Sequence, residues 1–479
     1  MDVDATTLPS SPGAPVISGS DIFGHPRGLV FIAGTEFWDR ISFTGMQALL
    51  VLYMAEELLR PGHIEKIAGF AAFRAVIEAA TGPLSAQSLA LQIFGFYIGL
   101  VYLLPVFGGL LGDRVLGRRN AVALGALLMT AGHFCMAFDR SFLLALLLLI
   151  LGAGALRGNL ASQLGDLYSK SDRRRESAFQ IYYAMLNTGG FIAPLITGEL
   201  GQKYGWHYGF GFAGVGMLVG LVVYLSGSRH LPPGAAREGG AARMPLTSHE
   251  RRIVRYLALM LPMLTLFWIG QAQIWDTYNL WARDHVDMMV AGWKMPVPWL
   301  QSIDALGAVV MVPPILWFWR WQAAHAREPD DLTKIGHGCL LFAVAIAWLA
   351  LAGRGVLADA TGKVPLWCAL LYHFLSAIGY LYFAPVVIAF FSRSAPAAVN
   401  AMMLGVYYLS IFAGSTISGR LGGLYERLSS SAFWLMHAAL VAAGGILILL
   451  FAKQLRRGLA GAADGRAARR AHPCADPMG

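Results

Sequence analysis

The sequence predicts an all-α membrane protein with twelve transmembrane helices arranged in two six-helix bundles. Hydrophobic residues make up 56% of the 479 residues and charged residues only 14%, whereas soluble domains carry about 25% charged residues. The mean hydropathy is +0.55, and most charges lie between long apolar segments. A polar segment at 227–253, which contains Pro232, Pro233 and Pro245, separates six of these segments from the other six.

Each apolar segment is long enough to cross the hydrocarbon core of a bilayer, which takes about 20 residues of helix. The segments are rich in Gly and other small residues, as close helix packing in a membrane requires. We predict spans at approximately 28–55, 88–111, 118–138, 141–165, 177–200, 208–226, 254–282, 297–320, 333–353, 364–391, 396–422 and 430–452. The predicted domains are a flexible tail at 1–24, bundles at 25–226 and 254–453, a cytoplasmic linker at 227–253 and a cytoplasmic tail at 454–479.

The distribution of basic residues predicts the orientation in the membrane. Lys and Arg are concentrated in the tails and in the connections on one side, and positively charged loops usually stay in the cytoplasm. We therefore expect a multi-pass plasma-membrane protein, in a bacterial inner membrane, with both termini cytoplasmic. The same bias accounts for the net charge of +9, so we expect the lipid bilayer and no nucleic acid as a partner. The four cysteines include no CxxC motif, and we expect neither a disulfide nor a metal site.

The first connection on the opposite side, at 56–87, is unusually long. Apolar residues such as Ile64, Ile67 and Ile77 alternate there with Arg74 and Glu78. This pattern predicts a short amphipathic helix on the membrane surface. We interpret it as an interfacial brace, with a mobile gate as the alternative.

Three charged residues lie inside the first span, in the string Glu36-Phe37-Trp38-Asp39-Arg40. At ~1.5 Å per residue they lie roughly 15 Å from the start of the span, near the middle of the bilayer. Their i, i+3 and i+4 spacing predicts one helical face. Intramembrane charges are costly and usually mark an ion or proton path, although a structural ion pair between two helices is the alternative.

The segment after the second span reads GLLGDRVLGRR, from Gly109 to Arg119. It resembles the loop between spans two and three of major facilitator transporters, in which two bundles of six helices rock about a central site. The resemblance implies a conformational latch and no substrate site. The latch residues would be Gly109, Asp113, Arg114, Gly117 and Arg118.

The first span and its surroundings resemble the proton-dependent oligopeptide transporter (POT) family. The motifs that carry the resemblance are His25-Pro26-Arg27-Gly28, the ExxER-like string at 36–40, the segments at 157–168 and 178–183 with Asn187, and Gly205-Trp206-His207-Tyr208-Gly209-Phe210. In the second half only Phe267-Trp268, Gln273 and Gln301-Ser302-Ile303 match. The resemblance covers most of residues 25–420.

The resemblance implies proton coupling through four residues of the first bundle, with protons as the coupling ion and no other cofactor. These residues are Glu36, Asp39, Arg40 and Arg157, where Arg157 replaces a Lys that in the family pairs with a carboxylate of the first-span motif. A carboxylate that loses a neighbouring cation binds a proton more tightly, so cargo that draws the cation away promotes proton uptake. The implied substrate-binding residues are Arg40, Phe43, Thr44, Gln47, Tyr102, Arg157, Asn187, Trp268, Gln273, Asp304 and Tyr380.

Several positions depart from the family pattern. Phe43, Thr44 and Gln47 replace two Tyr residues and an Arg. Ala272 and Tyr380 stand where the family carries Glu on the seventh and tenth spans. These departures put the usual recognition of a free α-amine in question, and either Asp276 or Asp304 could supply the missing negative charge. For Asp276, a position near outer water is the equal alternative.

The sequence as a whole predicts a monomeric proton-coupled symporter that imports di- and tripeptides or peptide-like carboxylates. The alternatives are a transporter of a non-peptide organic anion or an N-blocked peptide, and a non-transporting sensor or assembly factor on the same fold. No nucleophile with a placed base is apparent, so we expect no enzyme. His133, His373 and His437 show no metal-ligand spacing, and we interpret them as packed, hydrogen-bonded side chains.

Overall fold

The computed structural model describes residues 22, 24–169, 172–232, 246–355, 357–359, 361–396 and 399–459. Most of the predicted N-terminal tail, the middle of the linker and most of the C-terminal tail lie outside the described residues. The described chain is almost entirely helical, which confirms the predicted fold class.

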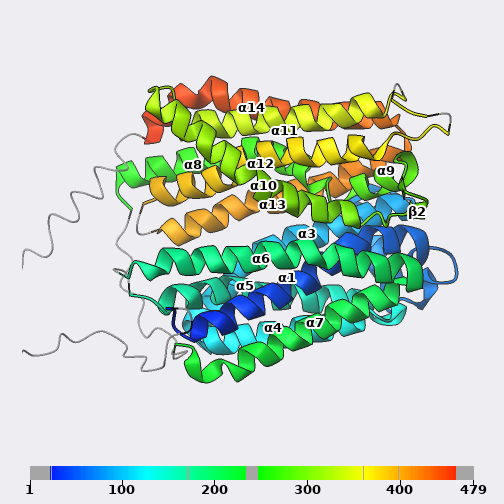
Figure 1. Ribbon diagram of the computed structural model, residues 1–479, viewed down its shortest axis with the longest axis horizontal. Coiled ribbons are helices and arrows are strands. Elements are labelled where there is room, and N and C mark those ends of the chain that lie inside the picture. Colours follow the sequence, from blue (N-terminus) through cyan, green and yellow to red (C-terminus); the bar gives the residue numbers. More distant parts are fainter. Residues whose placement is uncertain are drawn as a thin grey trace, which may run out of the picture.

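Two helical bundles lie side by side (Figure 1). The first contains α1 (Gly28–Tyr53), α3 (Ala86–Leu111), α4 (Arg118–Cys135), α5 (Phe142–Asp166), α6 (Arg174–Glu199) and α7 (Trp206–Ser226). The second contains α8 (Ser248–Ala272), α9 (Thr277–His285), α10 (Trp299–Ala324), α11 (Asp331–Ala352), α12 (Leu366–Ser394), α13 (Asn400–Gly422) and α14 (Ser430–Leu459). Across the boundary, α3 packs against α13 and α6 packs against α10.

The two ends of the molecule differ. The start of α1 and the end of α14 lie at the left of Figure 1, which we call the terminal end. The right-hand end carries α9 and a small antiparallel hairpin of β1 (Met289–Val290) and β2 (Trp293–Lys294), and we call it the hairpin end. The hairpin turn needs positive φ at Ala291 and Gly292, as a two-residue turn of this kind requires.

The composition of the helices fits a membrane protein. Among the described residues, nine helices are long and apolar enough to cross a bilayer. The other long helices are α1, α4 and α6, and α1 carries the three intramembrane charges predicted from the sequence. A multi-pass membrane protein is therefore confirmed, while the count of twelve spans stays a prediction.

The contact between α3 and α13 depends on glycine. A Cβ atom added to Gly95 would clash with the backbone oxygen of Ser415, and one added to Gly405 would lie 2.7 Å from Val106. Small residues allow helix backbones to approach this closely. The two helices therefore approach each other closely at these glycines.

Some predicted boundaries differ from the structure. The second bundle begins at Ser248, six residues before the predicted 254, because Thr247 and Glu250 form a capping box. The predicted span 254–282 is two helices, since the backbone of Asp276 leaves helical geometry between α8 and α9. The helix predicted within 56–87 is present as α2 (Phe70–Thr81), but the β-hairpin was not predicted.

Candidate functional site

A small cavity of about 180 Å³ lies between the two bundles. Its lining mixes polar and apolar side chains from both halves of the chain. Six predicted substrate-binding residues line it, namely Arg40, Thr44, Tyr102 and Asn187 from the first bundle and Asp304 and Tyr380 from the second. The cavity thus has a fixed cation on one wall and a carboxylate on the other.

The first ion pair of α1 adjoins this cavity. Arg40 Nε donates to Glu36 Oε1 at 2.8 Å, one helical turn away. The second carboxylate oxygen of Glu36 accepts a hydrogen bond of 2.5 Å from the hydroxyl of Tyr182 on α6. Glu36 is almost fully buried, whereas the side chain of Arg40 is 21% exposed. Arg40 can therefore contact a molecule in the cavity while Glu36 remains behind it.

Neither partner of the second ion pair of α1 lines the cavity. Arg157 on α5 places its Nε 3.4 Å from Asp39 Oδ2, and Asp39 is fully buried. The guanidinium of Arg157 also lies over the ring of Phe43, 3.9 Å from its centroid. This cation–π contact and the carboxylate together hold a cation inside the bundle.

The structure refines the prediction that Glu36, Asp39 and Arg40 share one face. Successive residues of a helix are separated by 100°, so Asp39 and Arg40 lie at opposite edges of that face. Asp39 faces α5, and Arg40 faces the cavity. The predicted pairing of Arg157 with a carboxylate of the first span is confirmed, and the partner is Asp39.

A third acid–base pair lies on the second bundle. Asp304 of α10 lines the cavity, and its Oδ1 is 3.5 Å from Nδ1 of His373 on α12. The side chain of Asp304 is 23% exposed, whereas His373 is fully buried. In the described part of the chain, neither ring nitrogen of His373 has a hydrogen-bond partner. The prediction that the histidines are hydrogen-bonded is therefore wrong for His373.

Other predicted binding residues lie elsewhere. Gln273 is fully buried in the second bundle, where its Nε2 donates to the backbone and side-chain oxygens of Ser418 at 3.1 and 2.9 Å. Its Nε2 also lies 3.1 Å from the ring of His437, which confirms that this histidine is hydrogen-bonded. Trp268 packs among aromatic residues of the same bundle. Neither side chain lines the cavity, because both point into their own bundle.

The remaining candidates are also buried away from the cavity. Gln47 is 5% exposed and does not line it. Asp276 is fully buried at the break between α8 and α9, and within the described residues its carboxylate accepts no hydrogen bond. Its side chain is therefore not in contact with solvent in this conformation. His133 is buried without a hydrogen bond to any described residue, contrary to the prediction.

The predicted latch connects three helices at the terminal end. Arg118 Nε donates to Asp113 at 2.8 Å, and the same guanidinium bonds to Asp166 at the end of α5. Gly117 has a φ of +74°, a conformation that glycine adopts most easily. A Cβ atom on Gly112 would clash with Asn159. Gly109 meets nothing nearby and Arg114 is exposed, so neither shares these contacts.

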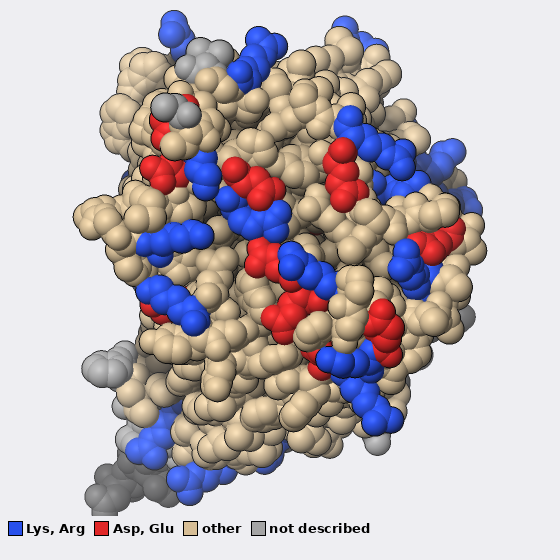
Figure 2. Space-filling model, turned by 90° about the vertical axis from the view of Figure 1, so that its right-hand side faces the viewer, with Lys and Arg blue, Asp and Glu red and all other residues tan. Residues whose placement is uncertain are grey.

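The bundles are joined by polar contacts at the hairpin end. Arg283 forms an ion pair with Glu56 at 3.1 Å, and Trp299 Nε1 donates to the backbone oxygen of Leu195 at 2.9 Å. The carboxylate of Glu426 accepts hydrogen bonds from Ser85 and Ser88. Figure 2 shows acidic and basic side chains side by side across this face. These contacts hold the two bundles together at the hairpin end.

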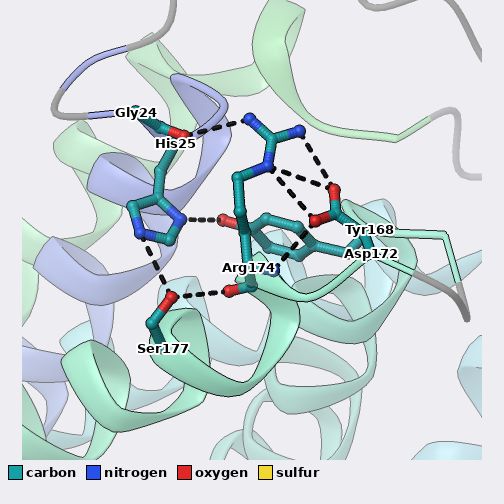
Figure 3. Close-up of polar contacts among 6 residues, drawn as sticks. All are labelled: Gly24, His25, Tyr168, Asp172, Arg174 and Ser177. Carbon is teal, nitrogen blue, oxygen red and sulfur yellow. Dashed lines mark hydrogen bonds and ion pairs between the residues drawn. The ribbon is translucent and has the colours of Figure 1, made fainter.

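A separate polar cluster lies at the terminal end (Figure 3). His25 lies 3.0 Å from the hydroxyl of Tyr168, and Arg174 donates to the backbone oxygen of Gly24 at 3.0 Å. Hydrogen bonds from the Arg174 side chain and backbone hold the pKa of Asp172 below its ordinary value. The cluster fastens the segment before α1 to the α5–α6 connection, which gives the His-Pro-Arg-Gly motif a structural role.

Sequence reasoning missed two residues of the site, Tyr182 and His373. Tyr182 was visible as part of the 178–183 motif, although nothing in its spacing paired it with Glu36. His373 is the residue that Asp304 contacts from a helix about seventy positions later. No local pattern links the two residues, because the contact depends on how α10 and α12 pack.

Known proteins resemble this chain over nearly its whole length. A family model described as the POT family matches residues 119–237 and 235–438. The chain is 28% identical over 502 residues to a di-/tripeptide transporter of Lactococcus lactis subsp. lactis, covering 90% of this chain and 96% of the relative. It is 27% identical over 508 residues to the peptide transporter YePEPT of Yersinia enterocolitica subsp. palearctica, covering 90% of this chain and 95% of the relative.

Solved structures of POT transporters also resemble this chain over nearly its whole length. The crystal structure of a peptide transporter POT in complex with sulfate matches with a TM-score of 0.80 at 27% identity, covering 92% of this chain and 97% of that one. A mutant in complex with alafosfalin matches with a TM-score of 0.80 at 28% identity and the same coverage.

Proposed function

Since this chain belongs to the POT family of transporters, we propose that it is a proton-coupled symporter that imports di- and tripeptides or peptide-like carboxylates. The observation that carries the proposal is that Arg40 and Asp304 face one cavity from opposite bundles. A short peptide is a zwitterion, with a carboxylate at one end and an ammonium group at the other. The two walls therefore match its two ends.

The ion pairs of α1 supply the proton coupling. When the carboxylate of the cargo draws Arg40 away, Glu36 loses its cation and takes up a proton. Asp39 and Arg157 form a second pair that a proton reaches only when α1 and α5 move apart, because Asp39 is fully buried. An Arg at position 157 keeps its own charge throughout, so the two carboxylates carry the protons. Cargo and protons then cross together as the bundles rock.

The orientation follows from the charge bias of the loops. The terminal end, with the start of α1, the end of α14 and the latch, faces the cytoplasm of a bacterial inner membrane, and the hairpin end faces outward. The contacts that join the bundles at the hairpin end then form the outer gate. Cargo in this conformation is released towards the cytoplasm. The protein acts as a monomer, since one chain contains the whole cavity.

A second candidate is a transporter of N-blocked peptides or other organic anions. Ala272 and Tyr380 favour it, because neither can act as the counter-ion of a free α-amine. Asp304 favours the free amine, because its exposed carboxylate lines the cavity. A sensor or assembly factor would have no use for three buried acid–base pairs, each of which is costly to maintain in a membrane.

The test is gradient-driven uptake by protein reconstituted in liposomes. Wild-type protein under an inward pH gradient should concentrate a labelled dipeptide. The Glu36→Gln variant should lose this uptake but retain exchange of peptide at equal pH, because Gln cannot release a proton. The exposed Glu65→Gln variant is the matched control and should resemble wild type. Undiminished concentrative uptake by Glu36→Gln would refute proton coupling through this residue.

A further inference from the structure

The second bundle pairs an acid with a histidine, Asp304 with His373. The proposed proton-coupling residues of the first bundle pair their acids with arginines only. His373 is fully buried on α12 and does not itself line the cavity, whereas its partner Asp304 does. A buried imidazole with unbonded nitrogens beside a carboxylate can hold one proton between the two groups. Asp304, which is partly exposed, then links that proton to the cavity.

The groups behind the pair are tyrosines. The ring centroid of Tyr278 on α9 lies 5.1 Å from that of His373, and that of Tyr372 lies 5.3 Å away. Their hydroxyls have no hydrogen-bond partner among the described residues. Both are uncharged near neutral pH, so Asp304 supplies the negative charge that a protonated His373 needs.

On its cavity side, Asp304 has both tyrosines and a cation among its neighbours. Tyr380 of α12 and Tyr102 of α3 line the cavity with Asp304, and Arg40 lines it from the first bundle. Arg40 is already paired with Glu36. A second cation entering the cavity would therefore meet Asp304 as the carboxylate exposed on the second bundle.

We propose that the ammonium group of the cargo and a proton compete for Asp304, with His373 as the group that stores the proton. This inference rests on the proposed function, since it assumes peptide cargo. Without an ammonium group, the proton stays on the pair, as imidazolium and carboxylate. When the ammonium group contacts Asp304, one carboxylate faces two cations in a poorly solvated site. The proton then passes from Nδ1 of His373 through Oδ1 of Asp304 to water in the cavity.

The exchange of a proton for an ammonium group at this site affects how many protons accompany the cargo. The site holds one proton without the amine and one ammonium group with it, so its net charge stays at zero. A cargo with a free amine therefore releases one proton that an N-blocked cargo leaves in place. The number of protons that accompany the cargo then depends on whether its amine is free.

The test compares alanylalanine with its N-acetylated form, using purified wild-type protein in detergent. Binding of the free-amine peptide in weak buffer should release about one proton more per protein than binding of the acetylated peptide. The affinity ratio of the two peptides should rise with pH, by up to about tenfold per pH unit, because binding of the free-amine peptide releases a proton. A ratio independent of pH between 5.5 and 8 would overturn the proposal.

Variants separate the two residues. His373→Gln should keep the preference for the free amine, because Asp304 remains, but the preference should no longer vary with pH. Asp304→Asn should lose the preference. The exposed His337→Gln is the control and should resemble wild type. Unchanged pH dependence in His373→Gln would refute the role of His373. Failure of wild-type protein to bind either peptide would instead refute the proposed function and this inference with it.

Discussion

The buried pair of Asp39 and Arg157 makes a quantitative prediction about stability. The 3.4 Å separation corresponds to an attraction of about 5 kcal/mol at an effective dielectric constant of 20. Removing one partner of a buried pair leaves an uncompensated charge, at a cost of about 3–5 kcal/mol. We expect Arg157→Gln to destabilise the protein by an amount in this range.

The double variant distinguishes this pairing from a simple loss of packing. Asp39→Asn alone leaves the Arg157 guanidinium stacked on Phe43 without its counter-ion, and it should also be destabilising. The combined variant contains no buried charge at this site, so it should be markedly more stable than the sum of the two single effects predicts.

The assay is denaturant unfolding in mixed micelles, followed by tryptophan fluorescence, for wild type, both single variants and the double variant. Arg140→Gln, at an exposed position of the hairpin end, is the matched control and should change stability little. Single effects that add to within about 0.5 kcal/mol would refute a direct coupling of Asp39 and Arg157.

Three further predictions concern the cargo, the latch and the terminal end. Amidation of the cargo carboxylate should weaken binding to wild-type protein by on the order of 2 kcal/mol. The Arg40→Gln variant should bind the acid and the amide with equal affinity, as measured at equilibrium. Gly117→Ala should slow initial uptake with unchanged affinity, because alanine at a φ of +74° costs roughly 1–2 kcal/mol. The pKa of Asp172 in the folded protein lies below its ordinary value of 3.8. The hydrogen bonds from Arg174 to Asp172 should therefore persist above pH 3.8 and be lost as the pH falls through the lowered pKa. Hydrogen exchange of the Arg174 backbone amide measures the loss of these bonds, and loss of its protection already near pH 6 would contradict the prediction.

The sequence predicted features that depend on a single helix or loop. The surface helix near Arg74 depends on neighbours within one loop, and the shared face of Glu36 and Arg40 depends on their spacing within one turn. Most of the membrane spans follow from hydrophobicity, since a bilayer requires long apolar segments, but α1, α4 and α6 are not among the nine apolar helices of the described residues. Arg157 was predicted to pair with an acid of the first span because the family motif, and not its own spacing, implied it.

The sequence was insufficient where two helices must meet. The contact of Asp304 with His373 joins α10 to α12, and the contact of Tyr182 with Glu36 joins α6 to α1. Gln273 was predicted to bind substrate, but the break after α8 directs it towards Ser418. That break was not predicted, because Gly270, the glycine before it, lies inside α8 and not at the break. Side-chain direction at such a site depends on the packed bundle.

The glycine contact between α3 and α13 also affects how the bundles move. Side chains that interlock would have to disengage before one helix could roll over another. Gly95 and Gly405 carry no side chain of their own, so few atoms have to disengage at these two positions, although Phe96 and Phe412 still meet across the contact. We therefore expect α3 and α13 to stay in contact near these glycines when the angle between the bundles changes.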